Sequence, residues 1–222
     1  VKSIVIMGGG VFSGGNVTEY AEANIWNDPH AADEVFAADW EVTVIGLDVT
    51  QKVICAHSEF SELSRNVPII GSFLEQATEF YIRFYKEAVG IDGCQMHDPI
   101  TVVATIYPDL FKYEYQPIEV CLELPRIGET IICKDKKRRL AKVAVDVDID
   151  AVKKIFFDTI SGNNHIEEKR DKILDIGCGT GLLGESFSSI NEDLWIEGVD
   201  ISSSMIRIAS LKRKKNLSIL FY

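Results

Sequence analysis

Short apolar runs rich in β-branched residues alternate with helical patterns along this chain, and the alternation restarts near the C-terminus. The first part holds "SIVIMGG" and "EVTVIGLDVT", and "KILDIGCGTGLLG" opens the second. Apolar strands that alternate with helices are typical of parallel sheets buried on both faces. The polar stretch 161–171 between the parts is predicted to be a linker. We therefore expect an α/β protein of two parts, residues 1–160 and 172–222.

Several segments between these runs have clear helix or strand patterns. "DPHAADEVFAA" predicts a helix with Pro29 in its first turn, and "DPITVVATIYPDLF" predicts another. "QPIEVCLEL" and "ETIICKD" predict two strands joined by a turn near Gly128, and "AKVAVDVDIDAVKKIFFDTI" predicts a strand followed by a helix. The clearest helix spans residues 72–89, where one stripe carries Phe73, Ala77, Phe80, Tyr81 and Phe84.

Composition narrows the classes of function. The net charge of −11 argues against a general affinity for nucleic acid or anionic membranes. No apolar run approaches the roughly 18 residues that a membrane-spanning helix needs. Five cysteines without a C-x-x-C pair predict reduced thiols rather than disulfides or a zinc site, as in a cytoplasmic protein. A strand that starts almost at Val1, without an initiator Met, suggests that the beginning of the chain is missing.

Polar residues in the first part follow predicted strands or begin a helix, where ligands of parallel α/β sheets bind. They are Asn16, Glu22, Asn24, His97 and Asp98. Amides bind sugar hydroxyls, carboxylates bind hydroxyls or hard cations, and a histidine donates protons. Other roles remain open: Asn16 could serve a turn, Asp98 could cap a helix, and His97 could be a hydrogen-bonded, half-buried residue. The glycines of residues 8–15 lack the Lys-Ser/Thr of a phosphate-binding P-loop.

Four motifs in this part occur in the order found in a known family. They are "MGGGVFSGGNVTEYAEANIWNDPHAA", "VTVIGLDVT", "MHDPITVVATIYPDLF" and "KVAVDVDIDAVKKIFF". Residues 3–160 resemble the C-terminal part of the inosine–uridine-preferring nucleoside hydrolases, which cleave ribonucleosides to ribose and free base. The common "AEFN" motif reads "AEAN" here, with Ala23 in place of a bulky residue. The family is commonly oligomeric, so a homo-oligomer is a further expectation.

The resemblance implies a role for each polar residue. It places the ribonucleoside's hydroxyls on Asn16, Glu22 and Asn24, with Met7 near the 5′ end of the sugar. It makes Asp98 a ligand of a calcium ion and of the sugar, and it places His97 near the base, whose departure it assists. The positive charge that develops on the ribose as the N-ribosidic bond breaks is stabilised by such contacts.

The aspartate cluster that supplies most calcium ligands in this family has no counterpart in the sequence. Family members carry it near their N-terminus as D-x-D-x-x-x-D-D, whereas "DVDID" at 146–150 lies in the C-terminal strand. Calcium takes six to eight oxygen ligands, which Asp98 alone does not provide. The chain as given is therefore expected to hydrolyse nothing.

The glycine turn of the second part, "LDIGCGTG", brings backbone close to a ligand. Its G-x-G-x-G spacing after Asp175 fits nicotinamide cofactors poorly, and Asp200 ends the next predicted strand, where a ribose diol would bind. Residues 172–210 resemble motif I of class I S-adenosylmethionine-dependent methyltransferases. The resemblance implies that Asp175, Gly177 and Gly179 flank the methionine moiety and that Asp200 binds the ribose. A tight turn without a cofactor remains the alternative.

Three hypotheses follow. Ribonucleoside hydrolysis ranks first because that resemblance covers most of the chain. The second is that methyl transfer is the parent activity, although the chain stops before any residues that would define a methyl acceptor. The third is a non-enzymatic fusion or fragment whose exposed sheet edges favour aggregation. The base preference is not predicted.

Overall fold

The chain divides into two compact units, residues 1–165 and 166–222. The computed structural model describes residues 3–134 and 137–162 in full, and residues 172–176, 195–200 and 217–221 as backbone strands. The first residues of the predicted linker, Ser161 and Gly162, end the last helix of the first unit. The remainder of the linker lies outside the described residues.

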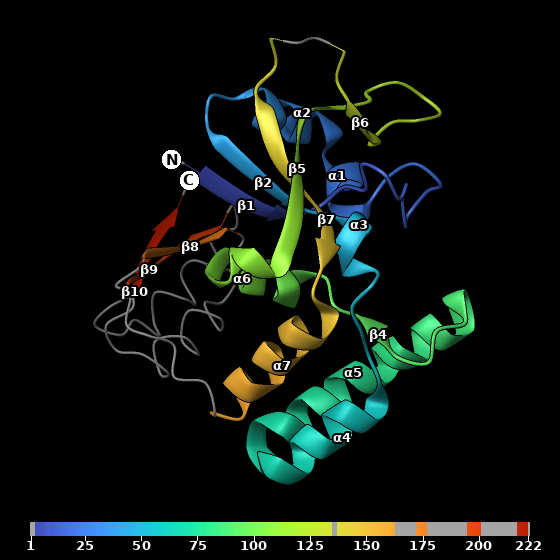
Figure 1. Cartoon of the computed structure of the whole chain (residues 1–222), viewed down its shortest axis with the longest axis vertical. Helices are drawn as coiled ribbons and strands as arrows, with labels where there is room; N and C mark the ends of the chain where they lie inside the picture. The colour runs from blue at the N-terminus through green and yellow to red at the C-terminus, as the bar shows by residue number, and fades with distance from the viewer. Residues whose placement is uncertain (1–2, 135–136, 163–171, 177–194, 201–216, 222) are drawn as a thin grey trace. The chain divides into compact units, whose positions relative to one another are not determined.

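A five-stranded mixed sheet forms the centre of the first unit (Figure 1). Three strands run parallel, and the last two in the order are antiparallel to their neighbours. The α/β class is confirmed, but a purely parallel sheet is wrong for this unit. A short turn at Gly128, with φ +85°, joins two of the strands, and such a connection suits only antiparallel neighbours. The strand order is β1 (Ser3–Met7), β2 (Glu41–Ile45), β7 (Leu140–Val147), β5 (Phe111–Val120) and β6 (Thr130–Ile132).

Helices cover both faces of this sheet. One core cluster joins strands β2, β5 and β7 to α1 and α2, and another joins the opposite face to α4, α5, α6 and α7. The helix predicted with Pro29 in its first turn is confirmed. The helix predicted over residues 98–111 is confirmed only as far as Ile106, because a 3₁₀ turn, Pro108–Leu110, follows and Phe111 begins β5. The helices are α1 (Ala23–Asn27), α2 (Pro29–Ala37), α3 (Leu47–Thr50), α4 (His57–Asn66), α5 (Pro68–Val89), α6 (Asp98–Ile106) and α7 (Ile149–Ile160).

Two predicted strands differ from expectation. The first, β1, forms one edge of the sheet, so its side chains are partly exposed instead of fully buried. The second apolar run stays extended only to Ile45, and its last four residues form α3. The chain turns at Gly46 because it passes close to the loop after β1. A Cβ at Gly46 would lie 2.7 Å from the carbonyl oxygen of Gly9.

The helix predicted over residues 72–89 is confirmed as part of α5, but its aromatic stripe does not face the core. Phe80 is 68% exposed, and the other aromatic residues of the stripe are exposed too. The buried face carries Ile82 and Tyr85 instead. Helix α5 packs against α4, with α7 beside them (Figure 1), and Gly71 lies at the α4–α5 contact. Helical periodicity locates a stripe, but it does not say which stripe the neighbouring helix covers.

A two-stranded antiparallel ribbon, β3 (Ile54–Cys55) and β4 (Cys94–Gln95), links the helical hairpin to the sheet. Cys55 and Cys94 lie opposite each other in it as free thiols. Burial raises the pKa of the Cys55 thiol to about 12 and that of Cys94 to about 11, so both stay protonated near neutral pH. Cys121 and Cys133 likewise form no disulfide, and Cys178 lies outside the described residues.

The described part of the second unit is a parallel three-stranded sheet in the order β10-β9-β8. This confirms the two strands predicted around the glycine turn, adds a third, and matches the 3-2-1 half of a doubly wound fold. The glycine turn predicted after β8 lies outside the described residues. The strands are β8 (Lys172–Ile176), β9 (Trp195–Asp200) and β10 (Leu217–Phe221). Across both units, the described helices include none that is long and apolar enough to span a membrane.

We predict that Gly71→Ala destabilises the α4–α5 hairpin. A Cβ at this position would lie 2.5 Å from the backbone oxygen of Leu63 and 2.7 Å from the Cα of Ser64. Helix propensity alone would make the change stabilising by about 1 kcal/mol, whereas overpacking against backbone costs about 1–3 kcal/mol. Urea unfolding followed by circular dichroism should show a net loss of about 1–2 kcal/mol.

The exposed Gln76 of α5 provides the control, because Gln76→Ala changes propensity without touching the contact. A stabilised Gly71→Ala protein would show that the hairpin is packed differently.

Candidate functional site

The glycine-rich loop after β1 directs its backbone N–H groups at the protein's own side chains. The N–H of Gly9 donates to Glu22 Oε2 (3.0 Å), and that of Gly10 donates to Thr130 Oγ1 (3.0 Å). Because these donors are already satisfied, they are not free to bind a phosphate. The loop shapes the site instead of cradling an anion.

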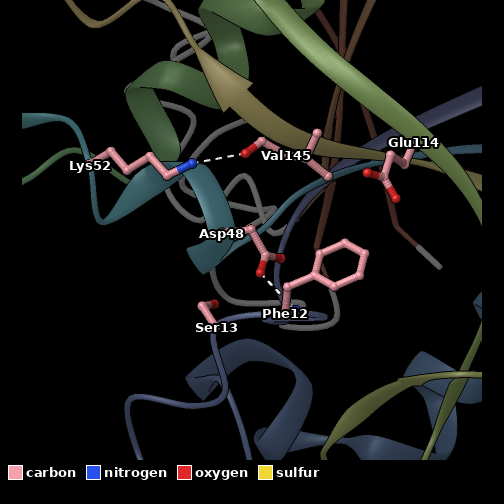
Figure 2. Close-up of a pocket in the computed structure, with 6 residues that line it drawn as sticks. All are labelled: Phe12, Ser13, Asp48, Lys52, Glu114 and Val145. Carbon is pink, nitrogen blue, oxygen red and sulfur yellow. Dashed lines mark hydrogen bonds between the residues drawn. The ribbon is translucent and has the colours of Figure 1, made fainter.

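A buried aspartate holds the next two residues of the loop. Asp48 of α3 accepts hydrogen bonds from the N–H of Val11 (2.9 Å) and of Phe12 (2.8 Å) through its two carboxylate oxygens. Figure 2 shows this carboxylate turned to the Phe12 backbone, beside a pocket of about 320 Å³. Lys52, also on the pocket wall, donates to the carbonyl oxygen of Val145 (2.8 Å). None of the sequence-predicted site residues lines this pocket.

Glu22 connects the loop to α1. Its side chain is 2% exposed and accepts three backbone hydrogen bonds. Oε2 accepts from Gly9 (3.0 Å) and Ile25 (3.2 Å), and Oε1 accepts from Asn24 (3.0 Å). A carboxylate has about four acceptor positions, so one position on Oε1 remains for a further donor.

Two exposed asparagines flank Glu22, and each uses one end of its amide within the protein. Asn24 Nδ2 donates to the backbone oxygen of Met7 (3.2 Å) and approaches its Sδ (3.3 Å). Asn16 Oδ1 accepts from the N–H of Ala23 (3.0 Å), so this side chain ties the loop to the start of α1. The structure thus brings Met7, Asn16, Glu22 and Asn24 together at the carboxyl end of β1. It leaves Asn24 Oδ1 and Asn16 Nδ2 without a hydrogen-bond partner among the described residues.

His97 is half-buried and hydrogen-bonded through both ring nitrogens. Nδ1 lies 2.8 Å from Thr50 Oγ1, and Nε2 lies 2.9 Å from the Tyr85 hydroxyl. That hydroxyl lies 3.2 Å from the hydroxyl of Tyr81, whose ring packs edge-on against Tyr85. The chain Thr50–His97–Tyr85–Tyr81 therefore joins α3, the start of α6 and α5.

The charge of Glu22, at the carboxyl end of β1, affects the pKa of His97. Burial lowers the pKa of His97, and the negative charges of Asp98 and Glu22 partly oppose this shift. The histidine is therefore mainly neutral near pH 7. Burial is also the main reason why the pKa of Tyr85 is raised, followed by its hydrogen bond with Tyr81.

Asp98 begins α6, but it does not cap the helix. The N-cap residue is His97, and no side-chain cap hydrogen bond forms there, so the capping alternative for Asp98 is wrong. The carboxylate is exposed at the positive end of the helix. Among the described residues, no three His, Cys, Asp or Glu side chains gather closely enough to hold a metal. A calcium ion with six to eight ligands does not fit these residues by themselves.

Sequence reasoning missed several residues that build the site. Thr50, Tyr85, Asp48 and Thr130 are all buried, and each binds a site residue or the loop. Tyr81 was assigned only to the stripe. The one available signal was the i, i+4 spacing of the two tyrosines, which places them on neighbouring turns of one helix.

In the second unit, Asp200 is the last residue of β9 and Asp175 is the fourth of β8. Asp175 pairs with Gly198 in the parallel register. Gly177 and Gly179 lie outside the described residues.

Comparison with known proteins identifies the family of the first unit. The model of the family "Inosine-uridine preferring nucleoside hydrolase" matches residues 1–154. The chain belongs to the inosine–uridine preferring nucleoside hydrolase family. The model of a second family, "Methyltransferase small domain", matches residues 131–219. This match overlaps the first at β7, which the structure places in the sheet of the hydrolase unit.

Individual relatives agree with this assignment. Uridine nucleosidase 1 of Arabidopsis thaliana is 36% identical over 138 residues, which are 62% of this chain and 41% of the relative. The inosine-uridine preferring nucleoside hydrolase of Leishmania major is 31% identical and covers 68% of this chain and 48% of the relative. Among solved structures, a purine-preferring ribonucleoside hydrolase from Gardnerella vaginalis superposes with a TM-score of 0.68 at 36% identity, over 72% of this chain and 52% of that one. The chain therefore spans about half the length of the relatives it matches.

We predict that Glu22→Gln destabilises the first unit by about 2–3 kcal/mol, because an amide would replace a charged acceptor of three backbone donors and point one N–H group at another donor. Urea unfolding followed by circular dichroism measures the loss. Glu34→Gln, at an exposed position of α2, is the matched control and should change stability by less than about 0.5 kcal/mol. Equal unfolding midpoints for the two variants would contradict this role of Glu22.

Proposed function

We propose that residues 1–160 carry the sugar-binding and base-releasing part of a ribonucleoside hydrolase, which splits the N-glycosidic bond to give ribose and free base. The observation that carries the proposal is the position of His97. Its ring is held from both sides, it lies next to the exposed Asp98 carboxylate, and it lies close enough to Glu22 to sense that charge.

The polar groups left over at the carboxyl end of β1 complement sugar hydroxyls. A hydroxyl both donates and accepts a hydrogen bond. Glu22 Oε1 and Asn24 Oδ1 would accept from ribose hydroxyls, and Asn16 Nδ2 would donate to one. Met7 would contact the 5′ end of the sugar beside Asn24. These contacts would tighten as positive charge develops on the ribose ring, which stabilises the transition state.

The base would leave toward the tyrosines. When the bond from C1′ to the base nitrogen breaks, its electron pair stays on the base, which then needs a proton or a hydrogen bond. His97 Nε2 is already bonded to Tyr85, so His97 would act on the base through the hydroxyls of Tyr85 and Tyr81.

A calcium ion is what the family resemblance implies at this site. Asp98 would be one ligand among several, and the other described residues do not complete a site. These residues alone would not retain the ion, so the purified chain is expected to leave uridine intact at any calcium concentration.

A chimaera tests the hydrolase proposal. The N-terminal, aspartate-bearing part of a family member is joined in front of the complete chain. We expect this protein to release base from uridine or inosine in a calcium-dependent manner. His97→Gln should lower kcat/KM by about 10²- to 10⁴-fold because the departing base loses its assistance. Base release is followed by liquid chromatography.

His57→Gln is the matched control, since His57 is an exposed histidine at the start of α4. It should leave the rate within about twofold. A folded chimaera that releases no base, or a His97→Gln chimaera as active as its parent, would contradict the proposal.

We also propose that the second unit derives from an S-adenosylmethionine-binding domain. The methyltransferase family match and the parallel order β10-β9-β8 support this. Asp200, at the end of β9, would accept from the ribose hydroxyls of the cofactor. Asp175, Gly177 and Gly179 would flank its methionine moiety.

Isothermal titration of the full chain with S-adenosylmethionine tests this second activity. Asp200→Ala should weaken binding by about 10-fold or more, which corresponds to one lost charge-assisted hydrogen bond. Asp92→Ala, an exposed aspartate of the first unit, should have no effect. The absence of any binding by the wild-type chain would rule out a working cofactor site.

A further inference from the structure

Thr50 is a fully buried hydroxyl beside His97. Its side chain is 0% exposed, and it ends α3. In the part of the chain that the structure describes, its hydroxyl has one hydrogen-bond partner, His97 Nδ1, at 2.8 Å. The backbone N–H of Thr50 bonds separately to the oxygen of Gly46, so the hydroxyl is free to serve the ring.

Which of the two groups, the Thr50 hydroxyl or His97 Nδ1, donates in this hydrogen bond follows from the hydrogens that each carries. A hydroxyl has one hydrogen and a neutral imidazole has one N–H, so only one of them donates across this contact. If Nδ1 carried the ring hydrogen, the Thr50 hydrogen would be buried without an acceptor and beyond the reach of water. The free energy of leaving a buried donor unpaired favours the other arrangement by a factor of about 10 to 100.

We propose that Thr50 is a positioning residue that donates to His97 Nδ1 and thereby holds the ring as the Nε2–H tautomer, with its hydrogen directed at Tyr85. This tautomer also sets the direction of the hydrogen bonds made by the Tyr85 and Tyr81 hydroxyls. The Tyr85 oxygen accepts from His97, so the Tyr85 hydrogen points to the Tyr81 oxygen. Tyr81 is 38% exposed and keeps its own hydrogen for an outside acceptor.

In this series of hydrogen bonds each group donates to the next, from the buried Thr50 through His97 and Tyr85 to the exposed Tyr81. The series presents a hydrogen-bond donor at its outer end, which suits a departing base that has gained an electron pair. That consequence rests on the proposed hydrolase function, whereas the tautomer of His97 does not depend on it.

Nitrogen NMR of the full chain tests the proposal. Histidine is labelled with ¹⁵N, and long-range ¹H–¹⁵N correlations are recorded at about pH 8.5, where neutral imidazoles predominate. The signals of His97 are assigned from their loss in His97→Gln. We expect Nε2 at the position of a protonated ring nitrogen and Nδ1 at that of an unprotonated nitrogen that accepts a hydrogen bond.

Variants at Thr50 separate the effect of its hydroxyl hydrogen bond from that of its side-chain shape. Thr50→Val keeps the shape and removes the donor, so Nδ1 should move toward the position of an unprotonated nitrogen without a hydrogen bond. Thr50→Ser should restore the wild-type position. Thr105→Val, the same change on the exposed side of α6, should leave His97 unchanged. If Thr50→Val does not fold, Thr50→Cys, a weaker donor of similar size, should give a smaller shift of the same sign.

A protonated Nδ1 in the wild-type chain, or a Thr50→Val spectrum identical to wild type, overturns the proposal. Neither result depends on turnover. An inactive chimaera with the expected tautomer removes the hydrolase function alone, and an active chimaera with a protonated Nδ1 removes the role of Thr50 alone.

Discussion

Two buried carboxylates organise the first unit. Glu22 and Asp48 come from different elements, yet both accept from backbone N–H groups of the loop that follows β1. Charge-assisted hydrogen bonds of this kind are short and strong, and a loop rich in glycine does not hold one shape without them. Because the loop is fixed, the residues that follow it return to the end of β1, where Asn24 reaches Met7.

The second constraint is the hydrogen-bond chain through His97. Thr50, His97 and Tyr85 come from three elements that are separated in sequence and meet at one ring. The ring therefore links α3, which follows β2 of the sheet, to α5 of the α4–α5 hairpin through hydrogen bonds. A histidine held in this way keeps one orientation, which a group that acts on a departing base requires. The structure confirms the hydrogen-bonded, half-buried state that the sequence left open for His97.

Much of the local structure could be predicted from the sequence, because it is set by neighbours along the chain. Asp28 before Pro29 starts α2, Asp148 caps α7, and the glycine at 128 makes the hairpin turn. Two predictions that were wrong concern the exposure of side chains, which is set by segments distant in sequence. Strand β1 is partly exposed because it lies at an edge of the sheet, and the aromatic residues of α5 are exposed because α4 covers the opposite side. The cap of α6 is His97, so the helix starts one residue earlier than the Asp-Pro pair indicates.

The sequence by itself determined the α/β class, the family motifs and the residue types at the strand ends, because each of these is written in short stretches of adjacent letters. Only the tertiary structure decided which acceptors remain free on Glu22 and Asn24, and which partners hold the ring of His97. Those properties depend on groups as far apart in sequence as Thr50 and His97 or Gly10 and Thr130. A hydrogen bond forms over about 3 Å in space whatever the separation along the chain, so no local pattern specifies it.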